Sequence, residues 1–320
     1  MIPNYNGERW LPGVLESVAA QTVAPVDVLV VDDASTDGSL ALLAERFASV
    51  RVLALPQNRG FAPTANAGIA AVAADAVALV NTDVVLAPDW LERAVDALAA
   101  LPGAASVATK LVELDDPTLL YDAGDVLRRD GACEQRGRFE RDTGRYDAPG
   151  EVFAACAGAA LYRRAALLAV GGFDERFGTY LEDVDLGLRL RLAGWSCRWE
   201  PRAVARHAGG GSSAALRRGP GAWVERNTLL LVARAFRARW LPLVAYRQLG
   251  WAWHAARAGA LRDHLAGARM ALPLLPAFAR ERRALRAAAV VPVEAAVPAR
   301  PIRGPRAGGH PSRHAPETAR

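Results

Sequence analysis

Residues 28–39 read VLVVDDASTDGS, and this stretch decides the fold class. The apolar run 28–31 has the length and composition of a buried strand, and it ends in the carboxylates of Asp32 and Asp33. The polar, glycine-containing segment that follows can turn the chain and cap a helix. A continuously apolar strand that leads into a helix is typical of a parallel sheet covered by helices on both faces.

The flanking sequence repeats this alternation of strands and helices up to about residue 110. Apolar residues recur at helical spacing before the run, from Trp10 to Val18. Up to residue 110, the pattern then predicts strands at 50–55 and 76–80 and helices at 63–72 and 88–101. Residues 111–150 are less regular and predict a variable loop region or a small sheet extension. A helix at 182–192 and strands at 196–200 and 203–206 are predicted after it. This order predicts an α/β fold with a mostly parallel sheet, in which ligands bind at the carboxyl ends of the strands.

Polar side chains stand at those strand ends. Asp32 and Asp33 end one predicted strand, and Asn81, Thr82 and Asp83 end another. Hard divalent cations bind carboxylate oxygens, so Asp83 suits a contact with a metal-bound diphosphate, whereas Asp32 or Asp33 can accept a hydrogen bond from a base or a ribose. Taken singly, each of these residues is better explained by a turn or a helix cap.

Two further polar groups lie later in the chain. Glu182, Asp183 and Asp185 stand in the first turn of a predicted helix. There they either interact favourably with the helix dipole or supply a general base. His207 follows the last predicted strand, where it can add a nitrogen ligand to a metal, although a loop cap is the simpler explanation of a lone histidine.

Taken in order, these segments resemble the large inverting family 2 glycosyltransferases of the GT-A fold, especially their rhamnosyltransferase-like bacterial members. The matching segments are 2–7 (IPNYNG), 30–39 (VVDDASTDGS), 58–61 (NRGF) with Asn66, 81–83 (NTD), 171–175 (GGFDE), 182–186 (EDVDL), Arg189, 194–195 (GW) and His207. The resemblance implies an enzyme that transfers a sugar from a dTDP- or UDP-linked donor to a glycan or lipid-linked acceptor, with Mg²⁺ or Mn²⁺ as cofactor.

The resemblance also implies a role for each matching residue. Asp183 is implied as the catalytic base, and Asp83 and His207 as metal ligands. The residues implied in binding the nucleotide sugar are Pro3, Tyr5, Asn6, Asp32, Asp33, Asn58, Arg59, Asn66, Asn81 and Thr82. Those implied in the pocket for donor and acceptor are Gly158, Glu182, Asp185 and Trp195. One base that activates the acceptor for in-line attack, with a metal that stabilises the leaving diphosphate, accounts for inversion.

Two features depart from the family pattern. Asn81 replaces the first aspartate of the family's Asp-x-Asp, as in many rhamnosyltransferase-like members. This replacement weakens the expectation of metal binding and makes a catalytically inactive nucleotide-sugar-binding protein the alternative. Family members also carry several apolar residues before Ile2, so we expect the natural start to lie upstream of Met1 and the chain to be poorly soluble as it stands.

The charge of the chain is distributed unevenly. Residues 1–215 hold 20 basic and 29 acidic residues, a net of −9, whereas residues 216–320 hold 19 basic and 5 acidic residues, a net of +14. We predict a catalytic domain at 1–215, a basic amphipathic helical region at 216–290 and a disordered tail at 291–320.

The helical region is rich in tryptophan and arginine. Its tryptophans are Trp223, Trp240, Trp251 and Trp253. Tryptophans among arginines are typical of a helix that lies on an anionic membrane surface, although they can also pack as core against the catalytic domain. Nucleic-acid binding is not predicted, because no recognition motif accompanies the charge.

Cysteine usage and hydropathy bear on the cellular setting. Cys133, Cys156 and Cys197 fit neither a zinc pattern nor a disulfide framework, and no apolar stretch of 18 residues is uninterrupted. We therefore predict a cytoplasmic protein that is peripheral at the inner face of the cell membrane. By resemblance, dTDP-rhamnose is the first candidate donor.

Two other enzyme classes fit less well. A nucleotidyltransferase also uses strand-end aspartates and a metal, but it needs a glycine-rich, lysine-containing phosphate loop that does not follow Asn6 and Gly7. A glycoside hydrolase can use paired carboxylates, but it has no need of the Asp32–Asp33 segment.

Overall fold

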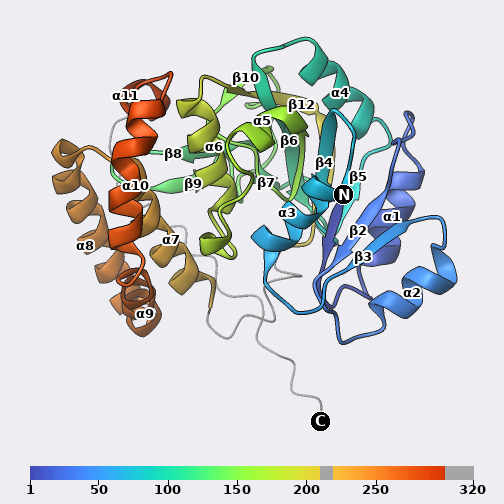
Figure 1. Cartoon of the computed structure of the whole chain (residues 1–320), viewed down its shortest axis with the longest axis horizontal. Coiled ribbons are helices and arrows are strands. Elements are labelled where there is room, and N and C mark those ends of the chain that lie inside the picture. Colours follow the sequence, from blue (N-terminus) through green and yellow to red (C-terminus); the bar gives the residue numbers. More distant parts are fainter. Residues whose placement is uncertain (210–218, 300–320) are drawn as a thin grey trace.

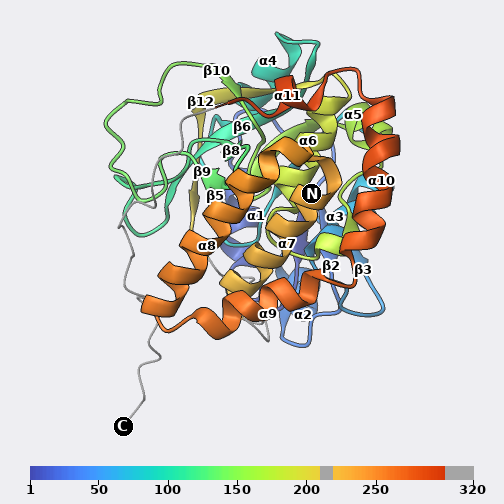
Figure 2. The same cartoon turned by 90° about the vertical axis from the view of Figure 1, so that its left-hand side faces the viewer.

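The computed structural model describes residues 1–209 and 219–299. Strands occupy the middle of the molecule, with the N-terminal helices α1 and α2 at one side and the C-terminal helices α7–α10 at the opposite side (Figure 1). Turning the molecule brings these C-terminal helices to face the viewer (Figure 2).

The first sheet is parallel, as the sequence predicts. It consists of β1 (Ile2–Asn4), β2 (Leu29–Asp32) and β3 (Arg51–Ala54), in the order β1-β2-β3. The connecting helices are α1 (Leu11–Ala19) and α2 (Ser39–Arg46). The register pairs Asn4 with Asp32, so the carboxyl ends of β1 and β2 meet at one edge of the sheet.

The second sheet is mixed rather than mostly parallel. Its main path runs β10-β12-β6-β11-β4, with β5 paired to β12 and β7 paired to β6. The bounds of these strands are β4 (Ala76–Val80), β5 (Val84–Leu86), β6 (Ala104–Glu113), β7 (Leu120–Asp122), β10 (Gly150–Val152), β11 (Ala159–Arg163) and β12 (Ser196–His207). β6 and β12 are parallel, whereas β11 is antiparallel to both β4 and β6.

Backbone hydrogen bonds connect the two sheets. The Met1 amino group donates to the Ala78 carbonyl at 2.9 Å, and the Val80 N–H donates to the Met1 carbonyl at 3.1 Å. β4 therefore continues the first sheet beyond β1. The helices α3 (Phe61–Ala71), α4 (Trp90–Ala99), α5 (Arg164–Ala169) and α6 (Glu182–Leu192) cover the strands.

Two sequence predictions differ in detail from the structure. The two strands predicted at 196–200 and 203–206 are one strand, β12, with a register irregularity between Glu200 and Val204. The segment 111–150 extends the sheet through β7 and β10, and it also forms a hairpin of β8 (Asp125–Leu127) and β9 (Cys133–Gln135).

The C-terminal helices share a hydrophobic core with α6. Their bounds are α7 (Pro220–Ala235), α8 (Leu241–Arg257), α9 (Leu261–Ala271), α10 (Leu275–Ala288) and α11 (Val293–Ala296). Leu188 and Leu192 of α6 belong to the same buried cluster as Leu230 and Phe278. Helices α7 and α10 are thus packed onto the side of α6 that faces away from the sheet.

The predicted disordered tail begins too early. Val293, Ala296 and Val297 are almost fully buried, and α11 packs against α6, because these apolar side chains complete the core of the C-terminal helices. The part of the predicted tail from residue 300 onward lies outside the described residues. Among the described helices, none is long and apolar enough to cross a membrane.

Candidate active site

Asp32 holds together the loop that follows β1. Its side chain is fully buried, and Oδ2 accepts hydrogen bonds from Asn4 Nδ2 at 2.7 Å and from Ser35 Oγ at 2.6 Å. The Asn6 N–H in turn donates to Ser35 Oγ at 2.9 Å. Tyr5 and Asn6 therefore lie on a loop whose backbone is fixed by the carboxylate at the end of β2, and Pro3 lies in β1 just before it.

Asp33 fixes the next loop in the same way. Its two carboxylate oxygens accept the backbone N–H groups of Arg59 and Gly60, at 2.9 and 2.8 Å. Gly60 has φ of 89°, a left-handed conformation that favours glycine. The preceding residue Asn58 is exposed, and the Arg59 guanidinium pairs with Glu175 at 2.7 Å.

Asn66, which was predicted to bind the nucleotide sugar, forms hydrogen bonds within the protein. Its amide bonds both backbone groups of Phe173: Nδ2 donates to the carbonyl at 2.8 Å, and Oδ1 accepts the N–H at 2.9 Å. A second contact of Nδ2 goes to Glu175. Asn66 thus uses its hydrogen-bonding capacity to hold the turn at Gly172 and Phe173.

Asp83 and His207 meet where β4 and β12 end. The Asn81–Asp83 turn leads into β5, whose Val84 pairs with His207 of β12. His207 Nε2 lies 3.2 Å from Asp83 Oδ1, and both side chains are buried. Across the same turn, the Asn81 N–H donates to the Gly158 carbonyl at 2.8 Å.

These two residues fit a hard divalent cation. Neither ring nitrogen of His207 has a hydrogen-bond partner of good geometry within the described residues. The imidazole ring of His207 packs edge-on against the Tyr121 ring, with the two ring centroids 4.1 Å apart, and this contact fixes the orientation of the imidazole. A Cβ added to Gly158 would lie 3.5 Å from Nε2, so glycine keeps the approach to the imidazole open. No group of three ligating side chains exists in the described part of the chain, so a cation here would need diphosphate oxygens to complete its coordination.

Asp183 stands in the first turn of α6, directly after a strained backbone turn. Tyr180 and Leu181 both have left-handed φ values, 66° and 61°. The Asp183 carboxylate accepts the N–H of Ala157 at 3.1 Å and that of Val184 at 2.8 Å. Burial nevertheless raises the pKa of Asp183 above its usual range, which makes it a stronger base once it is ionised.

Two carboxylates near Asp183 were not predicted from the sequence. Burial raises the pKa of Asp122 to about 6. Burial also raises the pKa of Asp125 well above its usual range, with help from the charges of Asp122 and Asp183. Gln135 Nε2 donates to Asp122 Oδ2 at 3.3 Å. Glu182 is also buried here, and burial together with the Asp183 charge raises its pKa.

A sequence signal for this pair existed. Asp122 follows the apolar pair Leu119-Leu120 much as Asp83 follows its strand, and Asp125 begins the next strand three residues later. The irregular composition of 111–150 concealed it. The four carboxylates form what we call the acceptor-side acidic cluster: Asp122, Asp125, Glu182 and Asp183.

A residue of α7 holds the turn that precedes Asp183. The fully buried Asn227 places Nδ2 within 3.0, 2.9 and 2.6 Å of the carbonyl oxygens of Phe177, Thr179 and Tyr180. The turn and Asn227 lie about 50 residues apart in the chain, so no local sequence pattern indicates the contact.

Two predicted pocket residues do not face the site. Asp185 is fully buried in ion pairs with Arg189 at 2.7 Å and Arg234 at 2.9 Å. Side chains two positions apart on an α-helix point to nearly opposite sides, so Asp185 faces α7 rather than the side of α6 that carries Asp183. Trp195 follows the far end of α6 and packs in the hydrophobic cluster beneath the sheet. Both side chains thus have partners inside the protein, and the structure does not bring them to the acidic residues around Asp183.

The fold and the site together define a nucleotide-sugar-dependent transferase. The model of the family described as "Glycosyl transferase family 2" matches residues 1–171, and the chain belongs to that family. The predicted family resemblance and the glycosyltransferase activity are confirmed.

Two curated glycosyltransferases are similar to this chain over more than half of its length. The chain is 32% identical over 228 residues to an N-acetylglucosaminyl-diphospho-decaprenol L-rhamnosyltransferase of Mycobacterium tuberculosis, and the aligned region covers 63% of this chain and 73% of the relative. It is also 32% identical over 191 residues to the pre-mycofactocin glycosyltransferase of the same organism, covering 56% of this chain and 37% of that protein.

Solved structures support the fold. The crystal structure of GalNAc-T7 with UDP, GalNAc and Mn²⁺ matches with a TM-score of 0.57 at 13% identity, over 74% of this chain and 47% of that chain. A mannosyltransferase from Pyrobaculum calidifontis in complex with GDP-mannose and Mn²⁺ matches with a TM-score of 0.51 at 21% identity, over 90% and 84%. The predicted GT-A fold, an α/β sheet flanked by helices with a C-terminal helical region, is confirmed.

Proposed function

We propose that this glycosyltransferase is an inverting enzyme that transfers L-rhamnose from dTDP-rhamnose to a lipid-linked or cell-surface glycan. One observation carries the proposal: the Asp183 carboxylate accepts the N–H of Ala157, and the carbonyl of the next residue, Gly158, accepts the N–H of Asn81 in the turn that carries Asp83. The rhamnosyltransferase named above supports the choice of sugar and of a lipid diphosphate acceptor.

Asp183 performs the proton transfer in this proposal. Its ionised carboxylate accepts the proton of the acceptor hydroxyl while the hydroxyl oxygen forms the new bond to the anomeric carbon. The bond from that carbon to the nucleotide diphosphate breaks in the same displacement, so the anomeric configuration inverts. Hydrogen bonds from Ala157 and Val184 keep the carboxylate aimed at one position.

The remaining residues hold the donor. Pro3 of β1 and the loops fixed by Asp32 and Asp33, which carry Tyr5, Asn6, Asn58 and Arg59, would surround the base and ribose. Asp83 and His207 would hold Mg²⁺ or Mn²⁺, which stabilises the charge that develops on the leaving diphosphate. The Mn²⁺ found in the two structures named above supports this cofactor.

Release of nucleotide diphosphate from a panel of dTDP- and UDP-sugars tests the proposal. We expect release from one donor, dependent on added metal and acceptor, and lost in Asp183→Asn and Asp83→Ala. Donor binding by calorimetry without any turnover in the presence of crude membrane acceptors would instead favour a nucleotide-sugar-binding protein and direct attention to Asn81.

We further propose that α8 attaches the protein to the inner face of the cell membrane. Tyr246, Leu249 and Trp253 form an apolar stripe at helical spacing, and their exposed fractions are 69%, 73% and 67%. Arg257 extends this stripe by one turn and lies over the Trp253 ring. Arginines beside exposed aromatic residues favour an anionic lipid surface.

The other predicted interface tryptophans lie elsewhere. Trp240 is buried in the core shared with α6, and Trp223 and Trp251 are partly buried. Trp240 is therefore a core residue rather than a membrane-facing one, because its ring fills the space between Phe236 and the neighbouring helices.

Co-sedimentation with vesicles of phosphatidylcholine and phosphatidylglycerol tests the attachment. Leu249→Glu combined with Trp253→Glu should weaken binding about tenfold or more, since each buried apolar side chain contributes about 1.5–3 kcal/mol. Val26→Glu, at a position 91% exposed in the N-terminal half, is the matched control. Equal binding of both proteins would refute a role of α8.

A further inference from the structure

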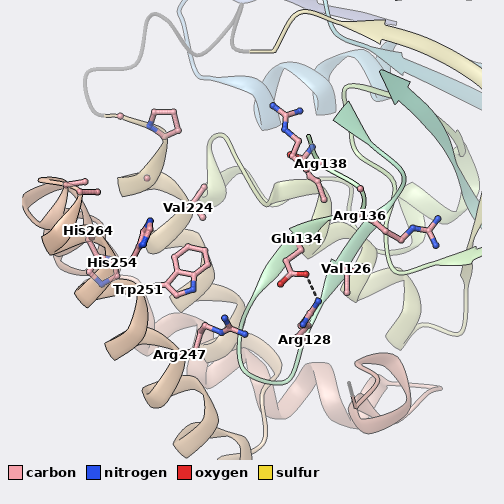
Figure 3. Close-up of a pocket in the computed structure, with 18 of the residues that line it drawn as sticks. Val126, Arg128, Glu134, Arg136, Arg138, Val224, Arg247, Trp251, His254 and His264 are labelled. Atoms are coloured by element: carbon pink, nitrogen blue, oxygen red, sulfur yellow. Dashed lines mark hydrogen bonds and ion pairs between the residues drawn. The ribbon is translucent and has the colours of Figure 1, made fainter. Parts of the chain in front are cut away.

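A cavity of about 930 Å³ lies between the β8–β9 hairpin and the C-terminal helices α7, α8 and α9. Figure 3 shows Arg128 and Glu134 of the hairpin on one side, and Arg247, Trp251 and His254 of α8 on the other. Its volume lies in the range of roughly 300–1,000 Å³ that is typical of small-molecule sites.

The wall of the cavity is divided into a basic part and an apolar part. Its lining arginines within the described residues are Arg128, Arg136, Arg138, Arg145 and Arg247, and its carboxylates are Glu134, Glu140 and Asp263. Ion pairs hold four of the guanidinium groups: Arg128 with Glu134 and Arg247 with Asp130, each at 2.5 Å, Arg138 with Glu113 at 3.7 Å, and Arg145 with Glu140 at 3.5 Å. A guanidinium has five N–H donors, so an arginine that is oriented by one carboxylate still has donors for an anion.

The apolar part comes mainly from the helices. Val224 of α7 and Trp251 and Ala255 of α8 line the cavity, and Val126 of the hairpin faces it from the other side. A ligand that fits both parts has an anionic group and an apolar chain.

The cavity adjoins the acceptor-side acidic cluster. Gln135 lines the cavity and donates a hydrogen bond to Asp122, which lies beside Asp183. Arg138 lines it as well, and its guanidinium lies 3.5 Å from the centre of the Tyr121 ring, which packs on His207. The cavity therefore approaches the proposed base and metal ligands from the side away from the donor loops of Asp32 and Asp33.

From these contacts we propose that the cavity binds the lipid diphosphate portion of the acceptor. This inference rests on the proposed function and adds the site of its second substrate. The lining arginines contact the diphosphate, and Trp251, Val224 and Ala255 contact the first part of the hydrocarbon chain. The sugar that precedes the diphosphate then extends toward Asp183.

The two faces of α8 support this assignment. Trp251 and Ala255 line the cavity, whereas Tyr246, Leu249 and Trp253 point outward. A lipid chain that leaves the cavity past α8 would therefore enter the bilayer beside the exposed stripe of the same helix.

Binding of geranylgeranyl diphosphate to the full chain tests the site independently of sugar transfer. We expect Ala255→Trp, which fills the cavity, to weaken binding at least about tenfold in calorimetry. Ala256→Trp, the same substitution at the next and exposed position outside the cavity lining, should change it less than about twofold. If Ala255→Trp lowers the melting temperature, Ala258→Trp at the exposed rim takes its place.

Two further probes separate the parts of the ligand. Geranylgeraniol, which lacks the diphosphate, should bind at least about tenfold more weakly than the diphosphate. No binding by the unmodified protein, equal binding by the Ala255→Trp and Ala256→Trp proteins, or equal binding of the alcohol would each overturn the assignment. Selective loss in Ala255→Trp without any sugar turnover would leave this site standing and refute the proposed function alone.

Discussion

Two groups of carboxylates lie in one protein and are built in opposite ways. Asp32 and Asp33, on the donor side, accept hydrogen bonds from backbone N–H groups, an amide and a hydroxyl. The acceptor-side acidic cluster holds Asp122, Asp125, Glu182 and Asp183 near one another, with raised pKa values. The donor-side pair stabilises two loops of the fold. In the acidic cluster the ionised carboxylates are disfavoured, so they bind protons more readily and contribute less to the stability of the fold.

The physical reason lies in what surrounds each carboxylate. Hydrogen bonds to an ionised carboxylate lower its free energy and tie the donor loops to β2. Burial beside other carboxylates raises the free energy of the ionised form, so the protein loses stability there but gains a base. The following experiments test this contrast.

The largest effect is expected at Asp183. Replacement by asparagine removes the only proposed proton acceptor, and kcat should fall about 10²- to 10⁴-fold. The dissociation constant of the donor should stay the same, because the donor loops depend on Asp32 and Asp33. Steady-state kinetics together with donor calorimetry measures both, and a weakened donor with normal kcat would reverse the roles of the two groups.

The next effect concerns metal binding. Chelation should abolish turnover, and His207→Ala should raise the Mn²⁺ concentration for half-maximal activity by about tenfold or more, since one nitrogen ligand is lost. A metal titration of activity gives this value. Turnover that survives exhaustive chelation would contradict the assignment of Asp83 and His207.

A moderate effect is expected at Asn227, which we regard as a positioning residue. Asn227→Ala frees the turn at Tyr180 and Leu181, so kcat should fall about tenfold while KM for the donor stays constant. Water would reach Asp183 and lower its pKa, so the acidic limb of the pH profile should move to lower pH. Thr228→Ala, at the neighbouring position, is the control, and an unmoved pH profile would leave Asn227 a purely structural role.

The smallest effect concerns stability. Folding raises the pKa of Asp122 from 3.8 to about 6. The contribution of protonated Asp122 to the free energy of unfolding is therefore fully present below the unfolded pKa and is lost as pH rises through about 6. Asp122→Asn removes this loss, and its melting temperature should exceed that of the unmodified protein by a few degrees at neutral pH but not near pH 3.5 (about the unfolded pKa). Thermal scans at both pH values measure the difference.

Asp33→Ala supplies the opposite result on the donor side. It leaves the N–H groups of Arg59 and Gly60 without their acceptor, and the melting temperature should fall. A stabilising Asp33→Ala or a destabilising Asp122→Asn would show that the two groups do not differ in the way described.

The sequence predicts the regular elements well because their signals are local. The predicted helix 182–192 is α6 to the residue, and the strand-end positions of Asp32, Asp33 and Asp83 are correct. Apolar periodicity and the polar residues that follow it are contained in a few consecutive positions.

The sequence does not predict the contacts of side chains whose partners come from distant segments. Asn66 is taken up by the turn at Phe173, more than 100 residues away, and Asp185 by Arg234 of α7. Asn227 belongs to the site only because α7 packs beside α6. A one-dimensional pattern contains no information about which of several buried polar groups will satisfy one another.

The contact between Asn227 and Tyr180 has a consequence for the order of events during synthesis. The chain emerges from its N-terminus, so both donor loops and Asp183 are complete before Asn227 is made, 47 residues after Tyr180. A nascent chain at that stage contains the turn at Tyr180 and Leu181 but lacks the Asn227 amide that holds it. The carbonyl oxygens of Phe177, Thr179 and Tyr180 therefore gain their side-chain donor only after α7 has been made and has packed beside α6.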